Sequence, residues 1–325
     1  MKKKKKTIIG LIILIIAVIA FFMIFNSKSK NKLEKTSLRL KWVCQAQFAG
    51  YYSALKEGYY KDVGLSVTID PAGPNISPIQ SVTSGVNEFG IAGAEQIITA
   101  IDNKVPIVAI VVIYRETPEA LVSKKELNIK VPKDLEGKTV GVVYENDENL
   151  YRLFLKKNNV DENSIKEVPA ITGISQVMTE QVDAKMAYEM NDAILLELEG
   201  EKVNLLRFRD YGIKVYADTI FTTKEMVEKH PDKVKKFLKA SLKGWNYAIE
   251  NPEKSVSQLI EINPTLKYEH QLGYLKGSIP LIMTDEKIGV SDSKIWENMI
   301  DNLYENKMIK KKIKASEVYT NEFLK

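Results

Sequence analysis

Extended and helical segments alternate along this chain from Leu38 to about Thr223, and this alternation most constrains its fold. Runs with an apolar residue at every second position predict strands, and the segments between them predict helices. Strands that alternate with helices favour parallel α/β sheets. The predicted strands are Ser37–Trp42, Leu65–Ile69, Phe89–Ala92, Val105–Ile113, Thr139–Tyr144, Val203–Phe208 and Asp218–Thr223.

The carboxy-terminal part of the sequence is helical in pattern. Apolar residues recur at intervals of three and four from Val234 to Ile249, which predicts an amphipathic helix whose stripe faces a core. Two further helices are predicted near Tyr268–Leu275 and Asp292–Asn306. Earlier in the chain, Ser77 before Pro78 is typical of a capped helix start.

The amino terminus has the pattern of a membrane anchor. Lys2 to Lys6 precede eighteen uncharged, mostly apolar residues, Ile8 to Phe25. This length is at the low end for spanning a bilayer, and the lysines favour a cytoplasmic amino terminus with the bulk of the chain outside. A cleaved signal peptide is the alternative. The polar residues from Asn26 to Ser37 are predicted to be a linker.

Composition narrows the class of protein. The 325 residues suggest about two domains, and 27% charged residues are typical of a globular chain. The net charge is +5, but five lysines lie in the amino-terminal run, so the remainder is nearly neutral. This balance does not favour nucleic acid as a partner.

Catalytic and metal-binding motifs are missing from the sequence. The single cysteine, Cys44, excludes an internal disulfide and a cysteine-based zinc site. A catalytic thiol needs a histidine partner, and the two histidines, His230 and His270, lie in helical sequence. Phosphate loops and dinucleotide fingerprints are also missing. We therefore expect a binding protein without catalytic residues, metal or cofactor.

The segment from Gln45 to Leu55 is the most informative for function. It is rich in amides and aromatic residues, and it lies between a predicted strand and a predicted helix. Ligands of open α/β sheets bind at such carboxyl ends of strands. Amides can donate and accept hydrogen bonds, and aromatic rings can stack on flat ligands. A buried strand–helix corner with core aromatics is the alternative.

The stretch from Leu38 to Ile69 resembles bacterial solute-binding proteins of the thiamine-pyrimidine-precursor type, which are related to the fungal pyrimidine synthases. The resemblance covers most of the chain after Ser37. It continues through Gly85–Ile91, Val105–Ala109, Thr117–Leu121 and Lys133–Val142.

The resemblance implies a two-lobed periplasmic-binding-protein fold, type II-like, with a hinged cleft. Residues 1–36 would be the anchor and linker. Lobe one would comprise 37–122 plus 222–325, and lobe two would comprise 123–221. The chain would cross between the lobes near Leu121–Lys124 and Phe221–Thr223.

The resemblance also implies which residues line the cleft. The first group is Trp42, Gln45, Gln47, Phe48 and Tyr51. Trp42 is the best candidate for stacking on a ligand, and a core residue at the strand end is the alternative.

Two further groups would lie in the first lobe. Gly93 and Glu95 begin a helix, where Glu95 could accept from a ligand amine or simply interact with the helix dipole. Tyr114 and Arg115 follow a strand. The family often has glutamine where Arg115 stands, and this arginine could bind an anionic group or pair with Glu116.

The last groups would come from the second lobe. Tyr144 and Glu145 leave its first strand, where a turn or a helix cap is the alternative. The family's tyrosine-asparagine-glutamate trio falls on Met190, Asn191 and Asp192. Asn191 is the best ligand contact, Met190 could touch a flat ring, and Asp192 could instead cap a helix. Asp218 is interpreted as structural.

We therefore expect the extracytoplasmic substrate-binding component of an ABC importer, anchored in the cell membrane and monomeric. Its ligand would be a small planar nitrogen heterocycle, such as a thiamine-related pyrimidine precursor. Permease and ATPase subunits would be separate chains. Riboflavin or another solute, or a role as an anchored ligand sensor, is the alternative. An enzyme of pyrimidine synthesis is disfavoured, because the fungal synthases need a histidine and a cysteine cluster, and the expected site of this chain has neither.

Overall fold

The computed structural model describes residues 33–73, 76–144, 148–283 and 287–324. The described residues from Lys35 onward form one compact unit. The predicted membrane anchor, Ile8–Phe25, lies outside the described residues. Among the described residues, no helix is both long and apolar enough to cross a bilayer.

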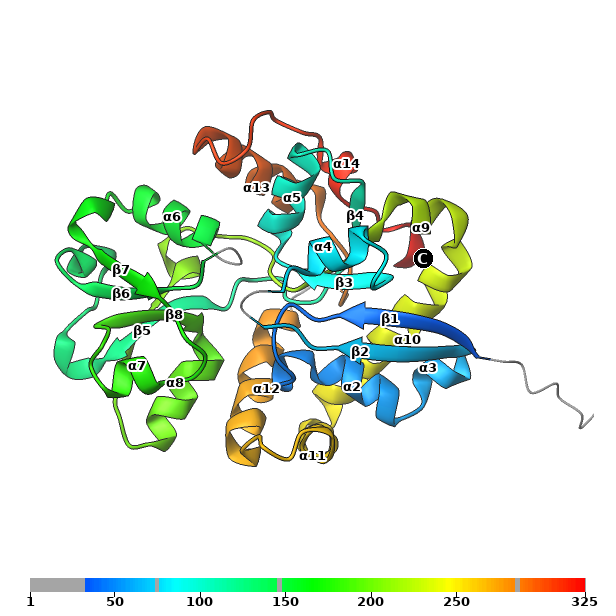
Figure 1. The fold of residues 1–325 in the computed structure, drawn as a ribbon, viewed down its shortest axis with the longest axis horizontal. Helices are drawn as coiled ribbons and strands as arrows, with labels where there is room; N and C mark the ends of the chain where they lie inside the picture. Colours follow the sequence, from blue (N-terminus) through cyan, green and yellow to red (C-terminus); the bar gives the residue numbers. More distant parts are fainter. Residues whose placement is uncertain (1–32, 74–75, 145–147, 284–286, 325) are drawn as a thin grey trace, which may run out of the picture. The chain divides into compact units, whose positions relative to one another are not determined.

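The first of two sheets has the strand order β2-β1-β3-β10-β4 (Figure 1). β1 pairs with β3 in parallel, whereas β10 is antiparallel to both of its neighbours. The predicted α/β class is confirmed, but the prediction of parallel sheets is wrong for β10, which makes the sheet mixed. β10 runs against its neighbours because it is the strand by which the chain returns from the second sheet. The strands are β1 (Glu34–Arg39), β2 (Leu65–Asp70), β3 (Phe89–Ala92), β4 (Ile107–Val112) and β10 (Thr219–Thr223).

The second sheet has the order β7-β6-β8-β5-β9, and β5 is antiparallel to both β8 and β9. Sequence patterns did not predict β5, β7 or β8. All six residues of β5 are buried, including its polar ones, so no alternation marks it. The strands are β5 (Glu119–Lys124), β6 (Thr139–Val142), β7 (Lys166–Pro169), β8 (Ala184–Tyr188) and β9 (Val203–Arg207).

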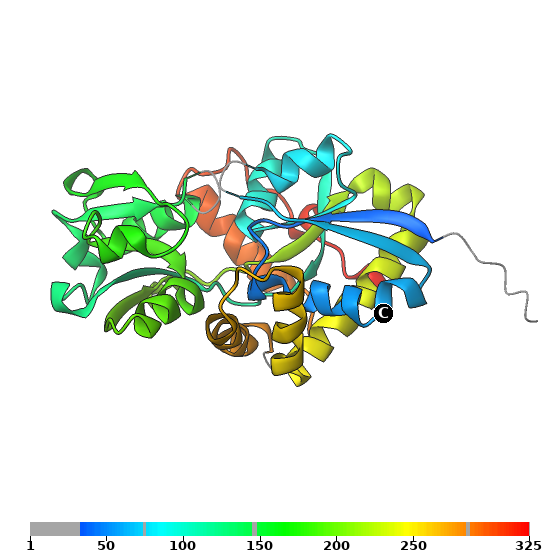
Figure 2. The same cartoon turned by 60° about the horizontal axis from the view of Figure 1, so that its bottom comes forward.

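The two sheets lie in separate lobes, and the chain passes between them twice (Figures 1 and 2). The crossings expected near 121–124 and 221–223 fall within β5 and β10, each of which belongs to a single sheet. The exchanges therefore occur several residues earlier, in the segments 113–118 and 212–218. We propose lobe boundaries there: a first lobe of 35–112 plus 219–324, and a second lobe of 119–211.

The helices surround the sheets. The amphipathic helix predicted from Val234 to Ile249 is confirmed as α10, and its apolar stripe is buried. Ser77 caps α4 as predicted, because its side chain accepts from the Gln80 amide. The first lobe contains α2 (Ala49–Lys56), α3 (Tyr59–Asp62), α4 (Pro78–Thr83), α5 (Ala94–Asp102), α9 (Lys224–Lys229), α10 (Pro231–Glu250), α11 (Pro252–Ile262), α12 (Tyr268–Ile282), α13 (Ser293–Glu305) and α14 (Ala315–Val318). The second contains α6 (Glu148–Lys157), α7 (Ser175–Met178) and α8 (Glu189–Leu198).

A close contact between α2 and α10 explains why the amide- and aromatic-rich segment has a glycine, Gly50, within α2. A Cβ atom added to Gly50 would lie 2.2 Å from the Trp245 ring, and one added to Gly244 would lie 2.2 Å from the Gly50 carbonyl oxygen. Both distances are below any tolerable contact. Each glycine therefore permits one helix backbone to approach the other, and Tyr51 packs edge-on against Trp245.

We predict that Gly244→Ala destabilises the protein by about 1–3 kcal/mol, the usual cost of overpacking a core. Denaturant unfolding measures the change. Gly73→Ala is the matched control, because a Cβ at Gly73 would meet nothing within 4 Å. An equal effect of the two substitutions would contradict the close-packing explanation.

Candidate binding site

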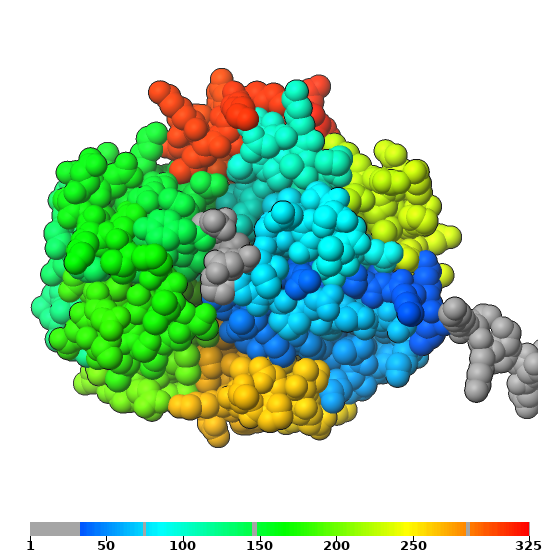
Figure 3. All heavy atoms as spheres, in the orientation of Figure 1, coloured from blue at the N-terminus to red at the C-terminus, as the bar shows by residue number. Residues whose placement is uncertain are grey.

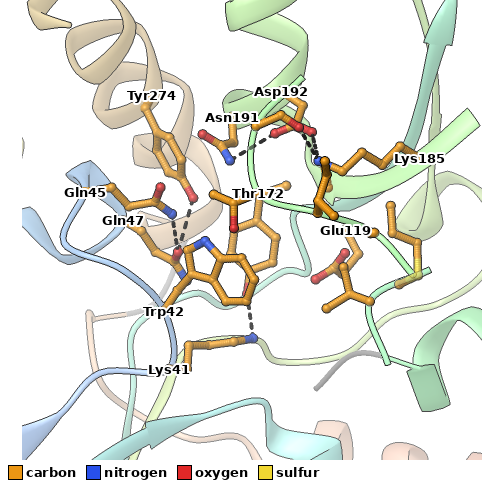
Figure 4. Close-up of a pocket in the computed structure, with 17 residues that line it drawn as sticks. Lys41, Trp42, Gln45, Gln47, Glu119, Thr172, Lys185, Asn191, Asp192 and Tyr274 are labelled. Carbon is orange, nitrogen blue, oxygen red and sulfur yellow. Dashed lines mark hydrogen bonds and ion pairs between the residues drawn. The ribbon is translucent and has the colours of Figure 1, made fainter. Parts of the chain in front are cut away.

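A cavity opens between the two lobes at the carboxyl ends of β1, β6, β7 and β8 (Figure 4). This is the place where open α/β sheets bind ligands. In Figure 3 the green surface of the second lobe adjoins the blue and cyan surface of the first. The cavity is lined by Lys41, Trp42, Gln45, Gln47, Glu119, Val143, Ala170, Ile171, Thr172, Gly173, Lys185, Met186, Ala187, Tyr188, Asn191, Asp192 and Tyr274.

A chain of hydrogen bonds crosses between the lobes beside the cavity. The Lys41 ammonium, after β1, donates to the Tyr188 hydroxyl at 3.0 Å. Tyr188, at the end of β8, donates in turn to an oxygen of Asp218 at 2.9 Å. The other oxygen of Asp218 accepts from the Gln47 amide at 2.9 Å. Asp218 directly precedes β10. This series of hydrogen bonds therefore joins the connecting segment before β10 to both lobes.

Amide groups of the first lobe form an ordered row. Gln45 donates to the side-chain oxygen of Gln47 at 2.8 Å, and the Tyr274 hydroxyl lies 3.5 Å from the same oxygen. Gln45 and Gln47 are 6% and 2% exposed. Buried amides with fixed partners present their remaining hydrogen-bonding groups in one orientation. Trp42 is half-buried and lies beside this row (Figure 4).

The opposite wall contains a buried ion pair. The Lys185 ammonium lies 2.5 Å from a carboxylate oxygen of Asp192, and it also donates to the Gly173 carbonyl at 2.6 Å. Asn191 donates to the second oxygen of Asp192 at 3.1 Å. Burial raises the pKa of Asp192 above its usual range, and the attraction of Lys185 opposes this rise.

Helices α8 and α12 bring the two lobes into contact next to Asn191. A Cβ added to Gly273 or Gly277 of α12 would lie 3.1 Å from Ile194 or Met190 of α8, respectively. A ring nitrogen of His270 lies 3.2 Å from the Asn191 carbonyl oxygen. Burial lowers the pKa of His270, which favours the neutral ring.

Four of the thirteen predicted ligand-binding residues line the cavity: Trp42, Gln45, Gln47 and Asn191. Four others lie in the core of the first lobe and its contacts. Phe48, Tyr51 and Tyr114 are at most 1% exposed, and Met190 is 3% exposed beside α12. For Phe48 and Tyr51 this placement matches the alternative given above, in which the aromatic residues of the segment belong to the core.

Gly93 and Glu95 lie at the start of α5, outside the cavity lining. The Glu95 carboxylate folds back over Gly93, since a Cβ on that glycine would lie 2.2 Å from a Glu95 oxygen. This position in the first helical turn is favourable for an acid.

The remaining predicted residues also lie outside the cavity lining. Arg115 donates to the Val290 carbonyl, and its guanidinium lies 5.6 Å from the Tyr216 ring centre. The Tyr144 hydroxyl lies 3.4 Å from an oxygen of Glu167. Glu145 lies outside the described residues.

Sequence reasoning did not select several residues that line the cavity. Lys41, Glu119, Lys185, Tyr188 and Tyr274 are the main examples. Glu119, Lys185 and Tyr188 lie on strands that the patterns did not predict. The sequence signal that could have indicated them is Lys185, which interrupts the apolar run of β8, because lysine is rarely buried without a partner.

The cavity lining does not contain the cysteine and histidine residues considered above as catalytic candidates. Neither histidine of the chain lines it, and Cys44 does not either. Burial raises the pKa of the Cys44 thiol, which disfavours the reactive thiolate. Within the described ranges, no group of three or more histidine, cysteine, aspartate or glutamate side chains is placed to hold a metal ion.

The cavity is small as it stands. Its volume is about 70 Å³, whereas pockets for small molecules usually measure ~300–1,000 Å³. A ring-sized ligand therefore needs the walls to move apart before it can enter.

Several curated proteins are similar to this chain over most of its length. A riboflavin-binding protein from Chloroflexus aurantiacus is 25% identical, with 90% of this chain and 86% of the relative covered. A formylaminopyrimidine-binding protein from Halalkalibacterium halodurans is 23% identical, with 91% and 93% covered. A 4-amino-5-hydroxymethyl-2-methylpyrimidine phosphate synthase from Legionella pneumophila is also 23% identical, with 89% and 92% covered.

Solved structures share the fold. The periplasmic aliphatic sulphonate binding protein from Escherichia coli aligns with a TM-score of 0.67 at 17% identity, covering 87% of this chain and 91% of that chain. At this identity the similarity concerns the fold alone, and the fold is that of two-lobed solute-binding proteins. The model of the NMT1/THI5-like family matches residues 45–255, which is more than half of the sequence. This chain therefore belongs to the NMT1/THI5-like family.

Proposed function

We propose that this protein is the extracytoplasmic substrate-binding component of an ABC importer for a small planar nitrogen heterocycle. A thiamine-related pyrimidine precursor is the first candidate, and riboflavin is the second. The main observation in support is a cavity between the two lobes, in which the Trp42 indole lies beside the hydrogen-bonded side-chain amides of Gln45 and Gln47. Relatives named for binding formylaminopyrimidine and riboflavin support this class of ligand.

Each wall of the cavity has a role in this proposal. Trp42 stacks on the face of the ring, because an aromatic surface is the best partner for a flat ligand. Gln45 and Asn191 bond to its edge from opposite lobes, since amides match the alternating donors and acceptors of a nitrogen heterocycle. Gln47 orients Gln45 through their 2.8 Å hydrogen bond.

Closure of the lobes completes the site in this proposal. The ligand enters an open form and is enclosed when the lobes approach, as in other hinged binding proteins. The hydrogen-bond chain from Lys41 through Tyr188 to Asp218 stabilises the closed form. A permease in the membrane would then accept the closed form.

The second candidate function is catalysis, which the relative named as a synthase suggests. We propose a binder instead, because no histidine or cysteine lines the cavity. Turnover of any bound pyrimidine, followed by chromatography, would favour the enzyme. An anchored sensor is a further alternative, and transport assays with a candidate permease and ATPase distinguish it from an importer component.

A ligand screen tests the proposal directly. We predict that one pyrimidine precursor of thiamine, or riboflavin, raises the melting temperature, because a ligand at ~100 times its Kd adds about 2.7 kcal/mol to the free energy of unfolding. Tryptophan-fluorescence melting of the folded protein measures the shift. A folded sample that responds to none of these compounds would contradict the proposed ligand class.

Substitutions in the cavity should weaken binding of the compound so identified. We expect Trp42→Ala to cost about 2 kcal/mol, or roughly 30-fold in Kd, as for buried aromatic anchors. Asn191→Ala should cost about 1 kcal/mol, or roughly fivefold, for one hydrogen bond. Isothermal titration calorimetry measures both. The control is Tyr304→Ala, an exposed aromatic of α13 outside the cavity, which should leave Kd unchanged. Equal affinities in all three variants would refute these ligand contacts.

Tyr188→Phe tests the hydrogen-bond chain between the lobes. The change removes the hydroxyl that contacts Lys41 and Asp218, so the unliganded protein should populate an open form more, and the radius of gyration from small-angle X-ray scattering should rise. Tyr211→Phe is the control, because its hydroxyl contacts only the Lys130 carbonyl of the same lobe in the hydrogen bonds described. An unchanged radius of gyration in Tyr188→Phe would show that these hydrogen bonds do not hold the lobes together.

A further inference from the structure

Four charged side chains line the cavity, and their formal charges cancel. Lys41 and Lys185 are cations, and Glu119 and Asp192 are anions. All four are at most 4% exposed. Buried charges interact strongly because little water screens them. A charged ligand would therefore disturb a balanced set, whereas a neutral ligand would not.

Lys185 and Asp192 form an ion pair within this set. The ammonium bonds to Asp192 at 2.5 Å and to the Gly173 carbonyl at 2.6 Å (Figure 4). Lys185 thereby fixes the first turn of α8 and the loop 170–173, which form adjoining parts of the wall. Asp192 also accepts from Asn191, so the pair orients the proposed ligand contact.

We propose that the Lys185–Asp192 pair is the charge filter of this site, which admits neutral ring compounds and rejects their phosphorylated or sulfonated counterparts. This inference rests on the proposed function and adds the charge of the ligand to it. An anion near Lys185 would compete with Asp192 for the ammonium. Losing that partner would leave a buried carboxylate without a counter-charge, which is strongly unfavourable.

The filter predicts a specific change of preference. In Asp192→Asn, Lys185 loses its counter-charge, so a bound anion can take the place of that carboxylate and the site should gain affinity for anions. In the double variant Lys185→Met/Asp192→Asn, both charges are gone, and that gain should disappear. The double variant also avoids the isolated buried carboxylate of Lys185→Met alone, which can prevent folding.

The experiment is calorimetric titration of the full-length protein in detergent. The probes are riboflavin and riboflavin 5′-phosphate, 4-amino-5-hydroxymethyl-2-methylpyrimidine and its phosphate, and inorganic phosphate and methanesulfonate alone. We expect the wild type to bind one neutral ring at least about tenfold more tightly than its phosphate, a ratio equal to about 1.4 kcal/mol. In Asp192→Asn this ratio should fall by at least about tenfold, and in the double variant it should return toward the wild-type value.

Lys124→Met is the matched control. Lys124 is also a buried lysine of the second sheet, and it lies 3.3 Å from Glu180, away from the cavity lining. Its replacement should leave the preference for neutral rings unchanged. The two substitutions change the net charge of the lobe in opposite directions, so a rise of the preference for neutral rings in Lys124→Met beside its fall in Asp192→Asn would assign the effect to the general charge of the lobe and overturn the filter.

Failure of the filter can be distinguished from failure of the proposed function. If the wild type binds a neutral ring and its phosphate equally, or if Asp192→Asn still rejects every anion, the filter is wrong and the importer proposal stands. If no ring compound binds, the proposed ligand class is wrong. The two inorganic probes then decide the filter, which requires Asp192→Asn to bind phosphate or methanesulfonate more tightly than the wild type does.

Discussion

The carboxylate of Asp218 holds the centre of this structure together. It lies where the chain re-enters the first sheet, and its two oxygens accept from Gln47 of the first lobe and Tyr188 of the second. A buried acid needs such donors, because an unpartnered carboxylate is costly away from water. One side chain thus links the connecting segment, the amide row and the end of β8. The cavity has a defined shape because these three parts meet at a single group.

The segment after β1 divides its residues between core packing and the cavity wall. Phe48, Gly50 and Tyr51 are buried, and Trp245 of α10 lies against both Gly50 and Tyr51. Gln45 and Gln47 lie at the turn before α2 and face the cavity. The aromatic residues of this segment thus belong to the core, and its amides belong to the cavity wall.

The sequence predicted most of the first lobe because its strands alternate in polarity and α10 has a regular apolar stripe. It also located the cavity, since strand ends and amides coincide at Gln45 and Gln47. It could not predict β5 and β8, where buried polar residues such as Glu119 and Lys185 interrupt the pattern. Those side chains are stable inside only because of partners distant in sequence, and no local pattern contains that information. The same limit applies to Tyr188 and Tyr274, which reach the cavity only through the packing of the lobes.

The three tryptophans of the chain lie in very different surroundings. Trp245 and Trp296 are fully buried in the core, whereas Trp42 is half-buried on the cavity wall. Water and small quenchers can therefore reach one indole while the other two give a constant background. Trp42 is therefore an intrinsic fluorescent probe on the cavity wall. The wavelength of its emission maximum and its quenching by iodide would report whether the cavity is occupied, in real time and without an attached dye.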